Sequence, residues 1–158
     1  MKRIYHTNKA SLLLMGIILT AQLFASCTVE SSSNGKLDGF WHLEAVDTLA
    51  TGGTADYSEQ RQFWGIEHKL ISVRDIDGGS SYYFRFEQKG DSLFLGQAYK
   101  NNGHQDNGEN GGDIPVTSPE DLQRFGITQL NEHFYKEVNN GSHLSLRSKT
   151  FRLRFVKF

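Results

Sequence analysis

The sequence predicts an all-β protein, a small antiparallel β-barrel of seven to eight strands with one short helix. After residue 36, apolar and aromatic residues alternate with polar ones in most segments, as half-buried strands do. Turn signals separate these segments, and the chain contains only two prolines, Pro115 and Pro119. Antiparallel strands linked mainly by turns favour closure into a barrel, because closure removes exposed sheet edges.

The first 26 residues have the layout of a secretory signal. They contain Lys2, Arg3 and Lys9, no acidic residue, and a mostly apolar run over residues 10–24. Fifteen helical residues cover about 22 Å, which is less than the roughly 30 Å of hydrocarbon in a bilayer. Residues 1–26 are therefore predicted to be a secretory signal peptide rather than a membrane span.

The signal ends at Leu23-Phe24-Ala25-Ser26-Cys27, which contains the only cysteine of the chain. This stretch resembles the lipobox of bacterial lipoproteins. The resemblance implies that Cys27 carries a lipid, palmitate included, and anchors the chain to a membrane of the cell envelope. The outer membrane is preferred, and the periplasmic or surface side is left open. The alternative is that Cys27 is a small apolar residue ending an uncleaved anchor.

Residues 27–36 are predicted to form a flexible tether, since residues 28–36 are small and polar. The folded domain is expected over residues 37–158 and cannot contain an internal disulfide. Loss of the signal removes three of the 17 basic residues and none of the 18 acidic ones, which moves the formal charge from −1 to −4. Nucleic acid is therefore not an expected partner.

Seven extended segments are expected. Trp41, Leu43 and Ala45 share one face of the first, and Gly65 is expected to bend the second. Lys89-Gly90-Asp91 and Asn139-Asn140-Gly141 are hairpin turn signals. The segments are residues 37–46, 60–74, 81–88, 92–99, 132–138, 143–147 and 149–158.

One short helix is expected where Ser118 precedes Pro119, Glu120 and Asp121. These residues match a capping serine, a proline at the first helical position and acidic residues at the positive end of the helix dipole. Gly126 is expected to end the helix. The polar runs over residues 47–58 and 100–116 are expected to be exposed loops.

Gly39-Phe40-Trp41 resembles the Gly-x-Trp signature of lipocalins. A longer likeness, to the lipocalin-like lipoproteins of Bacteroides-type bacteria, runs through residues 61–65, 83–93, 119–127 and 153–155. The resemblance implies a barrel whose first-strand tryptophan closes the bottom against a basic residue near the chain end. Arg152 or Arg154 would supply that residue, with Arg152 favoured, although a solvated strand arginine is equally compatible with the pattern.

The residues expected to face a ligand inside the barrel are Trp64, His68, Tyr82, Phe84 and Phe86. They follow the alternation of inward positions, with His68 as a polar handle among apolar groups. The competing interpretation is that all five belong to an ordinary core.

No catalytic arrangement, phosphate loop or zinc motif is present, so neither an enzyme nor a cofactor is predicted. The acidic and histidine residues of the 100–116 loop match no calcium-loop spacing, so no metal is predicted.

The sequence therefore predicts a membrane-anchored lipoprotein whose barrel binds a small apolar molecule in a cavity of a few hundred Å³. The alternative is a non-enzymatic interaction module with a filled barrel. Such a module would present residues 47–58 and 100–116 to a protein or glycan.

Overall fold

A computed structural model describes residues 32–103 and 112–158. Cys27 and the predicted signal peptide lie outside these residues, as do most members of the 100–116 loop. None of the helical segments within 32–103 and 112–158 has the length and apolar character needed to cross a bilayer.

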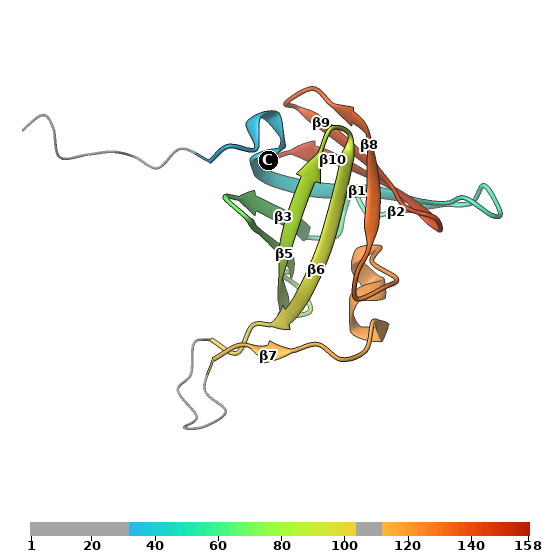
Figure 1. The fold of residues 1–158 in the computed structure, drawn as a ribbon. Helices are drawn as coiled ribbons and strands as arrows, with labels where there is room; N and C mark the ends of the chain where they lie inside the picture. Colours follow the sequence, from blue (N-terminus) through green and yellow to red (C-terminus); the bar gives the residue numbers. More distant parts are fainter. Residues whose placement is uncertain (1–31, 104–111) are drawn as a thin grey trace, which may run out of the picture. The chain divides into compact units, whose positions relative to one another are not determined.

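The described residues form one antiparallel sheet that closes on itself (Figure 1). Its strands follow the order β10-β9-β8-β6-β5-β4-β3-β1, and β10 pairs with β1 to complete the barrel. The predicted antiparallel barrel of seven to eight strands is thereby confirmed, with eight strands in its wall. The eight strands are β1 (Gly39–Thr48), β3 (Gln62–Glu67), β4 (Leu70–Asp75), β5 (Ser80–Lys89), β6 (Ser92–Lys100), β8 (His133–Asn139), β9 (His143–Arg147) and β10 (Phe151–Lys157).

Two short strands extend the barrel wall at its rim. β2 (Thr54–Asp56) pairs with the end of β1 and turns part of the expected 47–58 loop into a hairpin arm. β7 (Ile114–Pro115) pairs with the end of β6 at Tyr99 and Lys100.

The inward positions follow the predicted alternation. In β5, Tyr82, Phe84 and Phe86 are buried, while Arg85 and Glu87 are exposed. Leu153 and Phe155 of β10 face the same core. Burial of these apolar side chains stabilises the barrel by about 1.5–3 kcal/mol each.

The predicted long strand over residues 60–74 is wrong, because it is two strands. Glu67 pairs with Leu70, so His68 and Lys69 form a two-residue turn between β3 and β4. This division supplies the eighth strand of the barrel. Gly65 lies within β3 and leaves room for Ser72 Oγ, which would be 2.7 Å from a Cβ at that position.

The expected shared face of Trp41, Leu43 and Ala45 is also corrected. The register of β1 against β10 shifts between Leu43 and Ala45, which marks a β-bulge. After the shift Val46 pairs with Leu153 and joins the core cluster, while Ala45 pairs with Arg154.

Two 3₁₀ segments cover the two ends of the barrel. η1 (Gly35–Leu37) precedes β1 and buries Leu37 at the end where the β3–β4, β5–β6 and β8–β9 turns lie. We call this the η1 end. η3 (Glu120–Phe125) buries Leu122 and Phe125 at the opposite end, which we call the η3 end.

η3 is the short helix that the sequence predicts, but its cap differs. Pro119 occupies the N-cap position and no side chain caps the segment, so Ser118 does not play the expected role. Gly126 ends it as predicted, with φ of 76°. A Cβ on Gly126 would come within 2.2 Å of Leu153 Cδ2, so glycine also allows η3 to pack against β10.

The packed part of the chain begins before the expected boundary at Leu37. Ser32 Oγ donates a hydrogen bond to Asp38 Oδ1 at 2.7 Å and accepts one from His68 N at 3.0 Å. Asn34 Nδ2 donates to His68 O at 2.6 Å. Residues 32–36 of the predicted tether are therefore attached to the η1 end.

Candidate functional site

Four of the five predicted ligand-facing residues lie inside the barrel. Trp64, Tyr82, Phe84 and Phe86 are all buried. Trp64 contacts Phe155 of β10 at 5.2 Å and Phe134 of β8 at 5.9 Å between ring centroids. Side chains from separate walls of the barrel therefore meet at this level of the lumen.

Aromatic packing continues toward the η3 end. The ring of Tyr82 meets Phe125 of η3 edge to face, with centroids 5.8 Å apart. Burial raises the pKa of the Tyr82 hydroxyl, and the negative charge of Asp121 adds to this effect while Arg124 opposes it. The tyrosine therefore stays protonated and can act as a hydrogen-bond donor at this end of the core.

One polar atom in the lumen lacks a partner. Trp64 is fully buried, and its Nε1 makes no hydrogen bond within the described part of the chain. Buried N–H groups are nearly always paired, so this indole could donate to a water molecule or to a ligand.

His68 does not reach the lumen. It is an exposed residue of the β3–β4 turn with φ of 52°. Its backbone N–H donates a hydrogen bond to Ser32 Oγ, and its carbonyl accepts one from Asn34 Nδ2. The prediction for His68 is wrong because the alternation from Trp64 stops at the end of β3.

The predicted pairing of Trp41 with Arg152 is corrected as well. The ammonium of Lys157 lies 5.2 Å from the ring centroid of Trp41 and donates to Asp38 O at 2.7 Å. The indole of Trp41 is fully buried, and its Nε1 donates to Leu37 O at 2.8 Å. Lys157 is therefore the basic residue that closes the η1 end.

Arg152 lies on the outer surface, where it pairs with Glu137 at 2.6 Å. Arg147 binds the other oxygen of the same carboxylate at 2.7 Å. The hydrogen bond from Arg152 holds the pKa of Glu137 below its ordinary value, and Arg147 adds to this effect. This outer cluster ties β8, β9 and β10 together.

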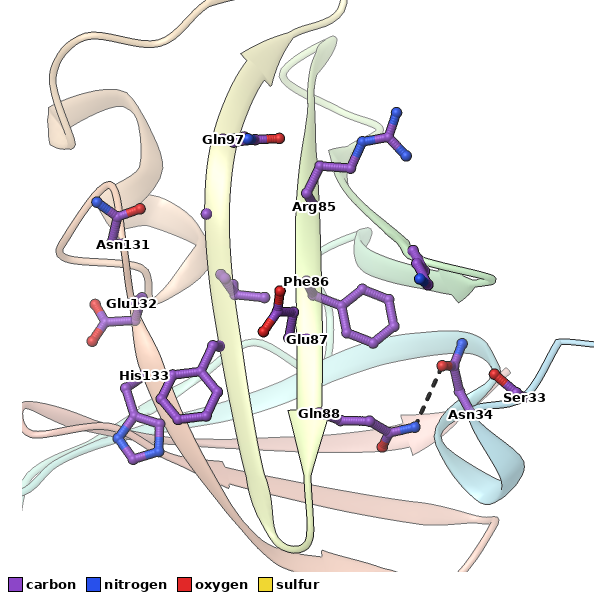
Figure 2. Close-up of a pocket in the computed structure, with 14 residues that line it drawn as sticks. Ser33, Asn34, Arg85, Phe86, Glu87, Gln88, Gln97, Asn131, Glu132 and His133 are labelled. Atoms are coloured by element: carbon purple, nitrogen blue, oxygen red, sulfur yellow. Dashed lines mark hydrogen bonds between the residues drawn. The ribbon is translucent and has the colours of Figure 1, made fainter.

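An open groove of about 980 Å³ crosses the outer face of β5 and β6 (Figure 2). Phe94 and His133 stack at one side, with ring centroids 4.5 Å apart and planes 13° apart. Asn34 and Lys69 lie toward the η1 end. We call this the β5–β6 groove.

A second hollow of about 540 Å³ continues along the same two strands. It shares Arg85 and Gln97 with the β5–β6 groove, and Tyr83 and Tyr99 line its far part. The two hollows therefore form one path over the outer surface.

The wall beside this path is irregular. β6 and β8 share only three register pairs, the last of which joins Phe94 to His133. Beyond it, Gln97 adopts φ of 50° at a bulge of β6 opposite β5. Such backbone costs about 1–3 kcal/mol and is common at binding sites.

Sequence reasoning did not identify the β5–β6 groove. The alternation does place Phe94 on the face opposite Leu93 and Leu95, which was the available signal. Its stacking partner His133 comes from a distant strand, so the pair could not be recognised from spacing alone.

Within residues 32–103 and 112–158, no group of three metal-ligating side chains is close enough to hold an ion. Among the acidic and histidine residues of the 100–116 loop, only Asp113 is described, and it accepts a hydrogen bond from Asn102 N.

Comparison with known proteins identifies the fold. Residues 22–158 match the model of a family described as a lipocalin-like domain. The chain belongs to this family. The sequence-based resemblance to lipocalin-like proteins is thereby confirmed. No curated protein matches the chain.

Two solved structures are similar to this lipocalin-like chain. A lipocalin-like protein from Bacteroides uniformis ATCC 8492 has 20% identity and a TM-score of 0.56, covering 78% of this chain and 100% of its own. An uncharacterized protein from Bacteroides eggerthii DSM 20697 has 14% identity and a TM-score of 0.48, covering 77% and 98%. The first shows the fold, which is typically a binding fold that can hold a small ligand.

Proposed function

We propose that this lipocalin-like protein is a lipid-anchored, non-enzymatic binding protein of the cell envelope that recognises its partner through the outer surface of the barrel. The packing of the lumen carries this proposal. Trp64, Phe134 and Phe155 meet inside the barrel, and η1 and η3 cover its two ends. The polar grooves, by contrast, lie outside.

The lipid anchor is supported by the lipobox-like residues 23–27 and the apolar run before them. Five residue steps separate Cys27 from Ser32, which allows a reach of at most about 18 Å. Because Ser32 is bound at the η1 end, an acyl chain on Cys27 would keep that end near the membrane. The η3 end would then be the end farther from the membrane.

Metabolic labelling with palmitate tests the anchor. We expect label on the wild-type chain and none on a Cys27→Ala variant, which should also leave the membrane fraction. Equal labelling of the two chains would rule out acylation at Cys27.

Native mass spectrometry of the full-length chain in mild detergent tests the proposed binding mode. We expect no tightly held apolar molecule beyond the covalent lipid, because the lumen is occupied by side chains. Release of a stoichiometric apolar molecule on unfolding would contradict binding through the outer surface alone.

A small apolar ligand in the lumen is the second candidate function, and the unpaired Trp64 Nε1 favours it. Entry would require η3 to move, because Phe125 packs against Tyr82. Titration with a fatty acid such as oleate, followed by the indole N–H resonances, tests this candidate. A shift confined to the Trp64 indole would support it, whereas unchanged resonances would rule it out for that probe.

A further inference from the structure

We infer that the β5–β6 groove binds a short oligosaccharide, an inference that rests on the proposed outer-surface binding and gives it a ligand class. The outward side chains of the two strands form three cross-strand pairs in sequence. Glu87 faces Phe94, Arg85 faces Gly96, and Tyr83 faces Tyr99. The order along the β5–β6 groove and the adjoining second hollow is therefore aromatic, glycine centre, aromatic.

Gly96 adds no side chain at the centre of this row, and it lines the groove. A Cβ at that position would lie 3.1 Å from Asn131 Oδ1, so Asn131 lies close against the glycine and borders the groove on that side. Arg85 borders it from β5. A ligand group can thus enter between the guanidinium and the amide.

Aromatic side chains stand on both sides of this glycine centre. Phe94 is 45% exposed although it stacks on His133, so much of its surface remains available to a ligand. Tyr83 and Tyr99 are half-buried, and the Tyr83 hydroxyl accepts a hydrogen bond from Asn101 Nδ2 at 3.2 Å. Five residue steps separate Phe94 from Tyr99, which is about 16 Å along a strand and suits a ligand of several rings.

The row also contains polar side chains that make no polar contact of their own among the described residues. Within 32–103 and 112–158, no side-chain hydrogen bond or ion pair is formed by Arg85, Glu87, Gln97 or Asn131. They offer guanidinium and amide donors together with carboxylate and amide acceptors. The bulge of β6 sets the direction of the Gln97 side chain, because the backbone of Gln97 has φ of 50° there.

This chemistry matches a sugar better than the other ligand classes. The C–H face of a pyranose packs on an aromatic ring, and its hydroxyl groups both donate and accept hydrogen bonds. The part of the groove floor formed by β5 and β6 is the face of two paired strands, whereas a peptide that extends a sheet docks on a strand edge. Glu87 offsets Arg85, so the groove lacks the basic surface that nucleic acid requires.

The first experiment applies the full-length chain in mild detergent to an array of oligosaccharides of two to six rings. One arm carries neutral hexose and N-acetylhexosamine chains, and the other carries uronic acid chains. We expect binding to at least one arm. Preference for uronic acids would indicate that Arg85 meets a carboxylate, and preference for neutral chains that it meets hydroxyl groups.

The bound oligosaccharide is then titrated into variants. We expect Phe94→Ala, Arg85→Ala and Gly96→Leu each to weaken binding at least tenfold, the last by placing a side chain at the glycine centre. Arg74→Ala is the matched control for Arg85, since both are exposed strand arginines. Phe158→Ala is the control for Phe94, since Phe158 is 84% exposed on another part of the barrel. Thermal melting checks that each variant is folded.

The outcomes separate this inference from the proposed function. Folded wild-type protein that binds no array member, or binding unchanged in all three groove variants, would overturn the oligosaccharide site. Capture of a protein partner that is lost in the groove variants would also overturn it while leaving outer-surface binding intact. Backbone amide shifts centred on Trp64 and Phe84 rather than on residues 94–97 would contradict both.

Discussion

Lys157 places its ammonium group over the indole of Trp41, 5.2 Å from the ring centroid, where the last strand of the barrel meets the first. Lys157 Nζ also donates a hydrogen bond to Asp38 O, so one side chain joins the end of β10 to the segment before β1. This contact closes the η1 end.

The closing pair predicts unequal effects of mutation. Trp41→Ala should destabilise the protein by about 3–5 kcal/mol, because it empties a fully buried aromatic site. Lys157→Met keeps the apolar stem and should cost about 1 kcal/mol. Urea unfolding measures both. An unchanged stability of Lys157→Met would contradict the assignment, whereas Arg152→Met reports on the ion pair with Glu137.

The register explains why sequence reasoning chose the wrong basic residue. Phe151, Leu153 and Phe155 point inward, so the alternation places Arg152 outside and Lys157 on the inward side. The prediction favoured arginine because a guanidinium can stack on an indole, and it did not apply the alternation of inward and outward positions to Arg152. Arginine stacking is common, but a side chain cannot cap a lumen from the outer face of a strand.

Other features could not be read from the sequence. The β3–β4 turn uses His68 and Lys69, which lack the glycine or asparagine that signals a tight turn. The bulge between Leu43 and Ala45 leaves no mark in the residue pattern. By contrast, the 81–88 and 92–99 hairpin was predicted well, because Lys89-Gly90-Asp91 fixes its turn and the alternation is regular.

Gly126 should tolerate no side chain. Gly126→Ala should cost about 2–4 kcal/mol, because it adds positive-φ strain and a clash with Leu153. Gly79→Ala is the matched control, with φ of 65° and nothing within 4 Å of the added Cβ. It should lose only about 1–2 kcal/mol. Equal losses in thermal unfolding would show that η3 does not pack tightly against β10.

Among the residues that the structure describes, His68 and Gln97 are the two other than glycine with positive φ, and they offer a second matched pair. Gln97→Gly and His68→Gly should each stabilise the protein by about 0.5–1 kcal/mol, since relief of strain outweighs the added chain entropy. Only Gln97→Gly should weaken oligosaccharide binding. Denaturant unfolding and titration of both variants check this, and loss of binding in His68→Gly would point to an indirect effect.

The ion pair between Arg124 and Asp75 fastens η3 to the end of β4. Asp75 is buried, so Arg124→Ala should cost about 1–3 kcal/mol and speed amide exchange across residues 120–127. Arg61→Ala, which removes an exposed pairing with Asp77, should change little. Unchanged exchange in η3 would show that other contacts hold it.

Glu137 predicts a dependence of stability on pH. Hydrogen bonds from Arg152 and then Arg147 lower the pKa of Glu137 in the folded protein. Near pH 4.5 this residue is therefore protonated more often in the unfolded chain than in the folded one. The carboxylate therefore stabilises the fold above about pH 4.5, and the contribution is lost as the pH falls through the lowered value. Glu137→Gln should cost less than about 1 kcal/mol at pH 7, since both arginines are exposed.

Unfolding curves of the wild type and Glu137→Gln between pH 3 and 7 measure this difference. The gap between the two proteins should narrow toward acid. A gap that widens as the pH falls would contradict the ion-pair assignment.

Phe158 N donates to Phe40 O, and Ser32 is bound to the same end of the barrel, so Ser32 and Phe158 lie at one rim. A capture tag fused after Phe158 would consequently orient the molecule on a sensor chip much as a lipid on Cys27 would orient it on a bilayer. On such a chip the side walls and the opposite rim of the barrel would be accessible to an analyte. The same surfaces are proposed to be accessible in the membrane-anchored protein.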